Sequence, residues 1–360
     1  MKPTIRSVRE SPYDRSLYVR RYPGEKREPT SPARWHTAVV TGANGFLGAH
    51  LVRALLRRGV HVRALVRPTS DVRVLEGLDV EIRRGALDDP TFLQDALKGV
   101  DVLFHLAALY SQRPEDVGLL YKVNVGLVRS LVKFAWDVGV PRIVHTSTIG
   151  VIGRRKDGRP PDEEAPFNLW DQASHYVRSK HLGEVAALTW ARMGAPVVVV
   201  NPTAPVGPYD WRPTPTGRRV LAVLAGRVPS YPPGGMNLVP AHDVAEGMIL
   251  AALKGRVAER YILGHLEGNW DVSRFVACVA QEAGIPNPLA LSPKPRGPRW
   301  LRAGLRRLRH VRGRRGHAPF SLTANPRKAV EELGMPQSDL CQAVRAAVEW
   351  YRERGYVGSF

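Results

Sequence analysis

From residue 37 to residue 200, short apolar runs alternate with longer segments of mixed apolar and polar character. The apolar runs have the length of buried strands, and they read TAVVT, HVRALV, VEIRR, DVLFHLA, RIVHTST and APVVVV. The segments between them, such as YVRSKHLGEVAALTWARMG, have the spacing of amphipathic helices. Because strands and helices alternate repeatedly, the pattern predicts an α/β protein with a doubly wound parallel sheet and helices on both faces.

After Val200 this alternation stops. Two stretches, NPTAPVGPYDWRPTPTG and PSYPPGGMN, are rich in proline and predict loops. RYILG reads as one more strand of the main sheet. We therefore expect a sheet domain at 37–205, to which 240–265 returns, and a smaller C-terminal substrate-binding region at 206–239 and 266–360.

Composition suits a globular protein, since 44% of the 360 residues are apolar. The first 15 residues lack the apolar core of a secretory signal, and no run approaches the roughly 20 apolar residues of a membrane span. Cys278 and Cys341 lie far apart in the chain, without the spacing of metal ligands. We expect a cytoplasmic protein with reduced cysteines and no metal site.

The net charge of +20 is concentrated in two segments. Residues 1–36 predict a basic leader without fixed structure. Residues 294–315 hold lysines and arginines but no acid, and Trp300 shares a predicted helix face with three leucines. This helix is expected either to contact an anionic membrane surface or to cover the substrate cleft. No motif that reads nucleic acid accompanies the charge, so nucleic acid is not an expected partner.

Three glycines follow the first predicted strand, in TGANGFLG. Gly42 permits a sharp turn, Gly45 leaves space at the helix N-terminus, and Gly48 lets the helix pack close to the strand. Unpaired amides and the helix dipole then attract a pyrophosphate. The glycines between a strand and a helix predict a Rossmann-type dinucleotide-binding site.

The spacing GxxGxxG, together with the pair Tyr176 and Lys180 in HYVRSK, resembles the extended short-chain dehydrogenases/reductases, the NAD-dependent epimerase/dehydratase family. The segments NPTAPVGP, PTPTG and NLVPAHDVAEG are most similar to hopanoid-associated sugar epimerases and dihydroflavonol 4-reductase-like proteins. The resemblance implies an enzyme that binds NADP or NAD. Arg67, where NAD-binding relatives tend to place an acid, favours NADP because a guanidinium can pair with a 2′-phosphate.

The resemblance also implies which residues form the site. The expected catalytic residues are Tyr176, Lys180 and Thr148. The expected cofactor-binding residues are Gly42, Asn44, Gly45, Phe46, Leu47, Gly48, Arg67, Leu87, Leu106, Ala107, Ala108, Asn124, Tyr176, Lys180, Pro202 and Thr203. No metal ligand is expected.

Tyr176 is predicted to move the proton of a substrate hydroxyl. A free tyrosine has a pKa near 10, and we expect the Lys180 ammonium and an oxidised nicotinamide to lower it. Thr148 is expected to orient the substrate oxygen. The four histidines at 105, 145, 175 and 242 lack any pairing with metal or carboxylate motifs, and we interpret them as structural.

The predicted activity is Tyr/Lys/Thr-assisted hydride transfer to or from a secondary alcohol or ketone of a sugar, a nucleotide sugar or a lipid-linked, hopanoid-type substrate. The same residues serve an epimerase, a dehydratase or an NADPH-dependent ketone or aldehyde reductase, so these stay alternatives. A cofactor-binding sensor and a membrane-surface scaffold are rival hypotheses, which retention of Thr148, Tyr176 and Lys180 disfavours. The resemblance also implies a homodimer.

Overall fold

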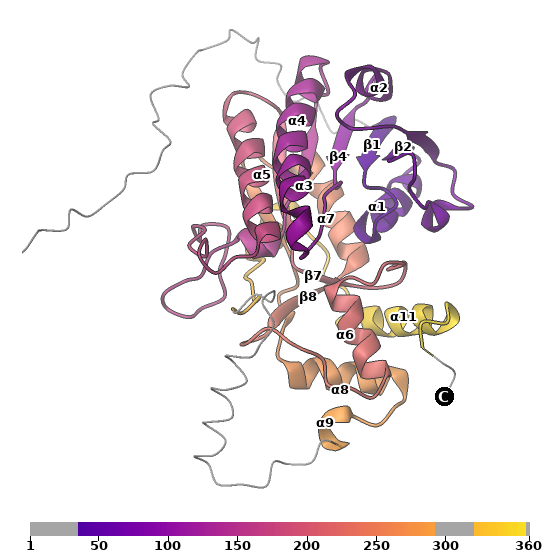
Figure 1. Cartoon of the computed structure of the whole chain (residues 1–360), viewed down its shortest axis with the longest axis vertical. Helices are drawn as coiled ribbons and strands as arrows, with labels where there is room; N and C mark the ends of the chain where they lie inside the picture. Colours follow the sequence, from indigo (N-terminus) through magenta and orange to yellow (C-terminus); the bar gives the residue numbers. More distant parts are fainter. Residues whose placement is uncertain (1–34, 292–319, 358–360) are drawn as a thin grey trace, which may run out of the picture. The chain divides into compact units, whose positions relative to one another are not determined.

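The larger of the two sheets in the structure is parallel and has seven strands. Its strands lie among the helices in the upper half of the view in Figure 1. The computed structural model describes residues 35–291 and 320–357. The strands lie in the order β3-β2-β1-β4-β5-β6-β9 and are β1 (Thr37–Thr41), β2 (His61–Val66), β3 (Glu81–Arg84), β4 (Val102–His105), β5 (Ile143–Thr146), β6 (Val197–Pro202) and β9 (Arg260–Leu263). Every pairing between them is parallel, which confirms the predicted fold class.

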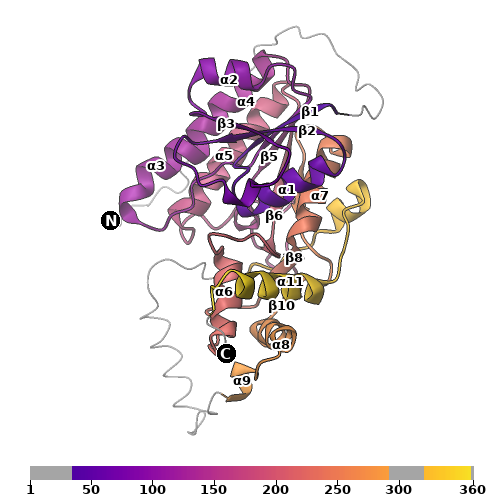
Figure 2. The same ribbon diagram turned by 90° about the vertical axis from the view of Figure 1, so that its right-hand side faces the viewer.

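Helices cover both faces of this sheet (Figure 2). One layer contains α1 (Phe46–Leu56) and α7 (Ala241–Lys254). The opposite layer contains α2 (Pro90–Ala96), α4 (Leu127–Asp137) and α5 (His175–Arg192). Each layer shares an apolar core with the sheet, so the central strands are buried on both faces and consist of nearly continuous apolar residues.

A second sheet of three strands lies outside the large sheet, in the order β10-β8-β7. Its strands are β7 (Ala204–Val206), β8 (Met236–Pro240) and β10 (Asn269–Trp270). It shares a separate apolar core with α6 (Pro215–Leu224), α8 (Val272–Ala283) and α11 (Leu340–Glu353). Figures 1 and 2 show these three helices grouped apart from those that flank the large sheet. The division into two domains remains a prediction.

Shorter elements complete the described chain. They are η2 (Arg73–Leu75), η3 (Pro114–Asp116), α3 (Val117–Tyr121), η4 (Lys122–Gly126), η5 (Ile149–Val151), α9 (Pro288–Leu291) and η6 (Ala329–Leu333). Across the described ranges, none of the helices combines the length and apolar character that a membrane crossing requires. The predicted basic segment 294–315, and the predicted leader except for its last two residues, lie outside these ranges.

Candidate active site

Two of the three motif glycines occupy places where a side chain would overlap the backbone. Gly42 has φ +68°, and a Cβ added there would lie 2.9 Å from the backbone nitrogen of Ala107. A Cβ on Gly48 would overlap the carbonyl oxygen of Gly42 and lie 2.8 Å from Cα of Ala43. Gly48 thus allows α1 to start directly against the loop, while Gly42 allows the loop to turn beside the segment after β4.

The first turn of α1 has no capping side chain and no acidic residue. Its N-cap, Gly45, is exposed and extended, with φ −86° and ψ 172°. Because the first amides of a helix have no partner within it, those of Phe46 and Leu47 are available to an anion. The helix dipole adds positive potential at the same place. The glycine cradle and these amides therefore fit the pyrophosphate of a dinucleotide.

We predict that Gly48→Ala weakens NADPH binding about tenfold or more, because the added methyl group has to push α1 away from the loop. Isothermal titration of the purified variant with NADPH measures this effect. The matched control is Gly126→Ala, since a Cβ at Gly126 meets no atom within 4 Å. Equal NADPH affinity in both variants would show that the cradle does not hold the cofactor.

Thr41, at the end of β1, fixes the loop that follows β4. Its Oγ1 accepts hydrogen bonds from the amides of Leu106 at 3.2 Å and Ala107 at 3.1 Å, and lies 2.8 Å from Nδ1 of His105. Since the hydroxyl oxygen already accepts two bonds, we assign its proton to the contact with Nδ1, which places the His105 proton on the buried Nε2. Burial lowers the pKa of His105 to about 3, so this buried imidazole is neutral.

Asn124 fixes the same loop from the side of η4. It is 1% exposed, its Oδ1 accepts from the amide of Leu109 at 2.8 Å, and its Nδ2 donates to the carbonyl oxygen of Leu109 at 2.9 Å. Nδ2 also donates to Oγ of Ser179 at 3.0 Å. The side chain therefore ties α5 to the segment containing Leu106, Ala107 and the exposed Ala108. Its contribution to cofactor binding, which remains a prediction, acts through this segment.

The other predicted cofactor residues also follow the carboxyl ends of strands. Arg67 is exposed after β2, and its guanidinium makes no ion pair or hydrogen bond with any described residue, while its carbonyl oxygen accepts from the amide of Ser70 at 3.0 Å. Leu87 is half-buried after β3, Pro202 ends β6, and the amide of Thr203 donates to the carbonyl oxygen of Leu263 at 3.0 Å. Asn44 donates to the carbonyl oxygen of Asp71 at 2.9 Å. In open α/β sheets, ligands bind at this carboxyl edge.

The predicted catalytic residues come from β5 and the start of α5. Tyr176 and Lys180 lie four residues apart in the first turns of α5, whose N-cap Ser174 accepts from the amide of Val177 at 3.3 Å. Thr148 follows β5 and caps η5. A Cβ on Gly150 would lie only 3.3 Å from Cγ2 of Val177, so η5 packs against the first turn of α5. The structure thus brings the two segments together.

The main chain at the end of β5, two residues before Thr148, holds the side chain of Lys180. Its Nζ donates to the carbonyl oxygen of Thr146 at 2.7 Å, and its side chain is 2% exposed. Burial lowers the pKa of Lys180 to about 8, against an opposing effect of Glu184. The ammonium is thus preorganised by a backbone contact but destabilised by loss of water.

The pKa of Tyr176 is raised, and not lowered as we expected from the sequence. Burial raises its pKa above the usual value, and the neighbouring phenol of Tyr110 adds to the shift. The two rings meet edge to face with centroids 4.8 Å apart. The expected lowering by Lys180 is therefore not found in the protein alone, because loss of hydration dominates. At neutral pH the hydroxyl of Tyr176 is protonated.

Sequence reasoning missed a buried polar network behind the catalytic residues. Glu184 is 1% exposed and pairs with Arg260 at 3.0 Å, and it also accepts from Nδ2 of Asn201 at 2.7 Å. Asn201 also donates to the carbonyl oxygen of Thr148 at 3.2 Å. The sequence contained a signal for this network, because Glu184 follows Lys180 by one helical turn and therefore lies on the same face of the helix. The contact of Tyr110 with Tyr176 had no such signal, since it joins the loop after β4 to the first turn of α5.

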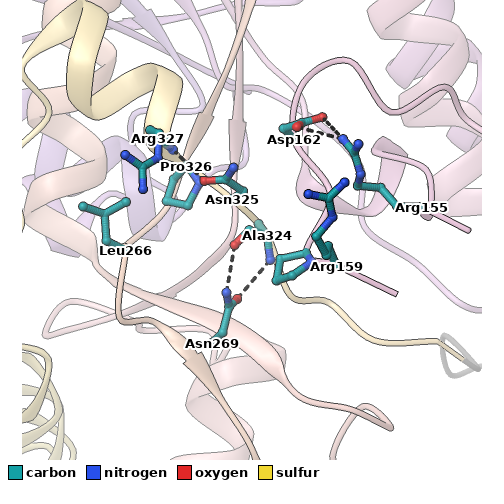
Figure 3. Close-up of a pocket in the computed structure, with 10 residues that line it drawn as sticks. Arg155, Arg159, Asp162, Leu266, Asn269, Ala324, Asn325, Pro326 and Arg327 are labelled. Atoms are coloured by element: carbon teal, nitrogen blue, oxygen red, sulfur yellow. Dashed lines mark hydrogen bonds and ion pairs between the residues drawn. The ribbon is translucent and has the colours of Figure 1, made fainter. Parts of the chain in front are cut away.

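A cavity of about 450 Å³ lies elsewhere, between the loop after η5 and the segment that leads to η6 (Figure 3). Arginines at 155, 159 and 327 line it, but each pairs with a nearby acid: Asp162, Asp157 and Glu331, respectively. None of its lining residues belongs to the predicted site. In the described part of the chain, no group of three or more histidine, cysteine or acidic side chains could hold a metal ion.

Comparison with known proteins finds matches to a family model and to curated relatives. The model of the NAD dependent epimerase/dehydratase family matches residues 38–264. Sterol demethylase protein B of Methylococcus capsulatus is 36% identical over 340 residues, 89% of this chain and 100% of that protein. The 4-hydroxy-2-methyl-3-oxo-4-farnesyl-3,4-dihydroquinoline-1-oxide ketoreductase of Stigmatella aurantiaca is 34% identical over 230 residues, 62% of this chain and 66% of that protein.

A solved structure adds a bound cofactor to the comparison. The dTDP-glucose 4,6-dehydratase DesIV from Streptomyces venezuelae, crystallised with NAD bound, is 26% identical. It superposes with a TM-score of 0.72 over 89% of this chain and 98% of that chain.

Proposed function

Because the chain belongs to the NAD dependent epimerase/dehydratase family, we propose that it is an NAD(P)-dependent oxidoreductase acting on a secondary alcohol or ketone. The observation that carries this proposal is the position of Thr148, Tyr176 and Lys180. They lie at the edge of the sheet that also presents the glycine cradle and the free amides of α1. One edge of the fold thus supplies both cofactor-binding and proton-transfer groups.

The mechanism follows from the protonation states of these residues. A bound nicotinamide cofactor supplies or accepts a hydride. Tyr176 donates its phenolic proton to the substrate oxygen during reduction and takes the proton back during oxidation. The Thr148 hydroxyl donates a hydrogen bond to the same oxygen and orients it. Lys180, held by the carbonyl oxygen of Thr146, places a positive charge beside the reacting groups.

A second candidate function is an NADPH-dependent ketone or aldehyde reductase, and the protonation of Tyr176 favours it. Burial raises the pKa of Tyr176, so the resting enzyme carries the proton that a reduced carbonyl oxygen needs. In the oxidation direction this proton has to leave first, which costs more when the pKa is high. An epimerase needs both directions, whereas a reductase needs only the favoured one.

For the substrate we propose a lipid-linked or isoprenoid alcohol or ketone. Two relatives that are at least 34% identical have names that refer to a sterol and to a farnesyl-substituted quinoline oxide. The dehydratase structure, at lower identity, is named for a nucleotide sugar, which stays the alternative class. Two assays of the purified enzyme distinguish the classes. Reduction of sterol ketones consumes NADPH and is followed at 340 nm, whereas conversion of dTDP-glucose is followed by chromatography of the nucleotide sugar, because a redox-neutral reaction leaves no net change in the cofactor.

We also propose that the enzyme works as a homodimer in the cytoplasm, with α3, α4 and α5 at the interface. Leu119 and Val185 are large apolar residues of α3 and α5, and they are 48% and 39% exposed. Burying such side chains against a second copy would remove apolar surface from water. Contact of segment 294–315 with a membrane surface remains an additional proposal from its sequence.

Cofactor choice is the first experimental test of the proposed function. We expect the purified protein to bind NADPH more tightly than NADH, because the exposed Arg67 is free to pair with the 2′-phosphate. Arg67→Glu should weaken NADPH binding about tenfold or more and leave NADH nearly unchanged. Titration of both cofactors against wild type, Arg67→Glu and the α4 surface variant Arg129→Glu measures this.

The control makes the same charge change on a helix that lacks predicted cofactor contacts. A protein that is purified with tightly retained NAD would contradict the Arg67 assignment and would favour a self-contained epimerase. Failure to bind either dinucleotide would contradict the proposed function itself.

A further inference from the structure

The two cysteines of the chain, 63 positions apart in the sequence, meet between two helices of the C-terminal region. Cys278 lies on α8 and is 7% exposed, while Cys341 lies in the first turn of α11 and is half-buried. Their Sγ atoms are 2.8 Å apart, and both are free thiols. A disulfide has an S–S bond of about 2.05 Å. The two sulfur atoms therefore need only a small approach to become bonded.

The packing around the thiols holds the two helices in this register. One turn further along each helix, Glu282 of α8 pairs with Arg345 of α11 at 2.6 Å. The far end of α11 is also fixed, because Arg352 donates to the carbonyl oxygen of Ala283 at 2.6 Å. Because these contacts hold α8 against α11, the packing of the two helices keeps the two sulfur atoms close together.

The surroundings of the two thiols give them different reactivity. Burial raises the pKa of the Cys278 thiol, and the neighbouring Cys341 and the carboxylates of Glu282 and Asp339 act in the same direction. Arg345 is bound to one of these carboxylates, that of Glu282. The more exposed Cys341 is thus the sulfur that first meets an external reagent.

We propose that Cys278 and Cys341 form a dithiol modification site, which a small-molecule disulfide such as oxidised glutathione converts into an intrachain disulfide between α8 and α11. Cys341 loses its proton to water and attacks the reagent, which forms a mixed disulfide and releases one thiolate. Cys278 then loses its proton and attacks the Cys341 sulfur, which releases the second thiolate. Two protein thiols are oxidised and one external disulfide is reduced to two thiols, which regain the two protons.

The disulfide is expected to change the stability of the fold more than the activity of the enzyme. It would close a covalent loop that includes the whole segment between α8 and α11, with the basic residues 294–315 inside it. Closing a long loop restricts the unfolded chain, so the oxidised protein should be the more stable form. The site is independent of Tyr176 and Lys180, and its test does not depend on the proposed function.

The test compares the intact reduced protein before and after incubation with oxidised glutathione. Remaining thiols are alkylated, and a tryptic digest is analysed by mass spectrometry. We expect peptide 275–296 to be found covalently linked to peptide 329–345, with a thermal unfolding midpoint about 5 °C higher or more. Adding a reductant should separate the peptides and restore the original midpoint.

Cys341→Ser and Cys278→Ser serve as matched controls, in which oxidised glutathione should leave the unfolding midpoint unchanged. The result on wild type does not require either variant to fold. Recovery of both peptides alkylated, persistent glutathione adducts on single cysteines, or a disulfide between two chains on a non-reducing gel would each overturn the proposal.

Discussion

Replacing Tyr176 by phenylalanine is expected to lower kcat by about a thousandfold or more, while the affinity for the cofactor stays nearly unchanged. The substitution removes only the hydroxyl, which makes no hydrogen bond to any other described residue and is the proton donor in the proposed mechanism. The ring keeps its edge-to-face contact with Tyr110, so the fold and the dinucleotide cradle should be preserved. The loss should therefore affect kcat and not binding.

The measurement combines steady-state kinetics on a ketone substrate with direct titration of NADPH. Tyr121→Phe provides a matched control, since it removes a phenol that lies 3.3 Å from Nδ1 of His175, outside the proposed machinery. Its kcat should remain within about twofold of wild type. Turnover of Tyr176→Phe at the wild-type rate would rule out the proton-transfer role of this residue.

The fold was largely predictable because the central strands of its sheet are buried on both faces. The first four residues of β6, at 197–200, are consecutive buried valines, and such apolar runs are visible without a structure. The roles of Gly42 and Gly48 were also predictable from the sequence. Neighbouring backbone atoms leave no space for a Cβ at either position, so only glycine fits there. Local sequence therefore determined both the sheet and the cradle.

Features that depend on contacts between distant segments were not predictable in this way. The raised pKa of Tyr176, on α5, depends on burial and on Tyr110, which lies in the loop after β4. The contacts of Asn124 and the meeting of Cys278 with Cys341 likewise arise only when distant segments of the chain pack together. Sequence could name the reactive side chains, but their protonation and neighbours are properties of the tertiary structure.

Replacing Lys180 by methionine is expected to lower kcat about a hundredfold or more and yet to stabilise the cofactor-free fold at pH 7. Burial lowers the pKa of Lys180 from 10.5 to about 8, which corresponds to a cost of roughly 3 kcal/mol for holding the ammonium in the fold. The variant loses the hydrogen bond to the carbonyl oxygen of Thr146, which offsets about 1 kcal/mol of this gain. A net gain of roughly 2 kcal/mol remains.

The pH dependence separates this electrostatic cost from a packing effect. Between about pH 8 and pH 10.5 the unfolded chain binds a proton at Lys180 that the folded chain has lost, so wild-type stability rises with pH in this window. The advantage of Lys180→Met in urea unfolding should therefore be largest at pH 7 and nearly absent by pH 10. Lys133→Met, which removes an exposed lysine paired with Asp137, should show no such pH dependence. An advantage of equal size at both pH values would mean that burial does not lower the pKa of Lys180, and the gain in stability would then come from packing.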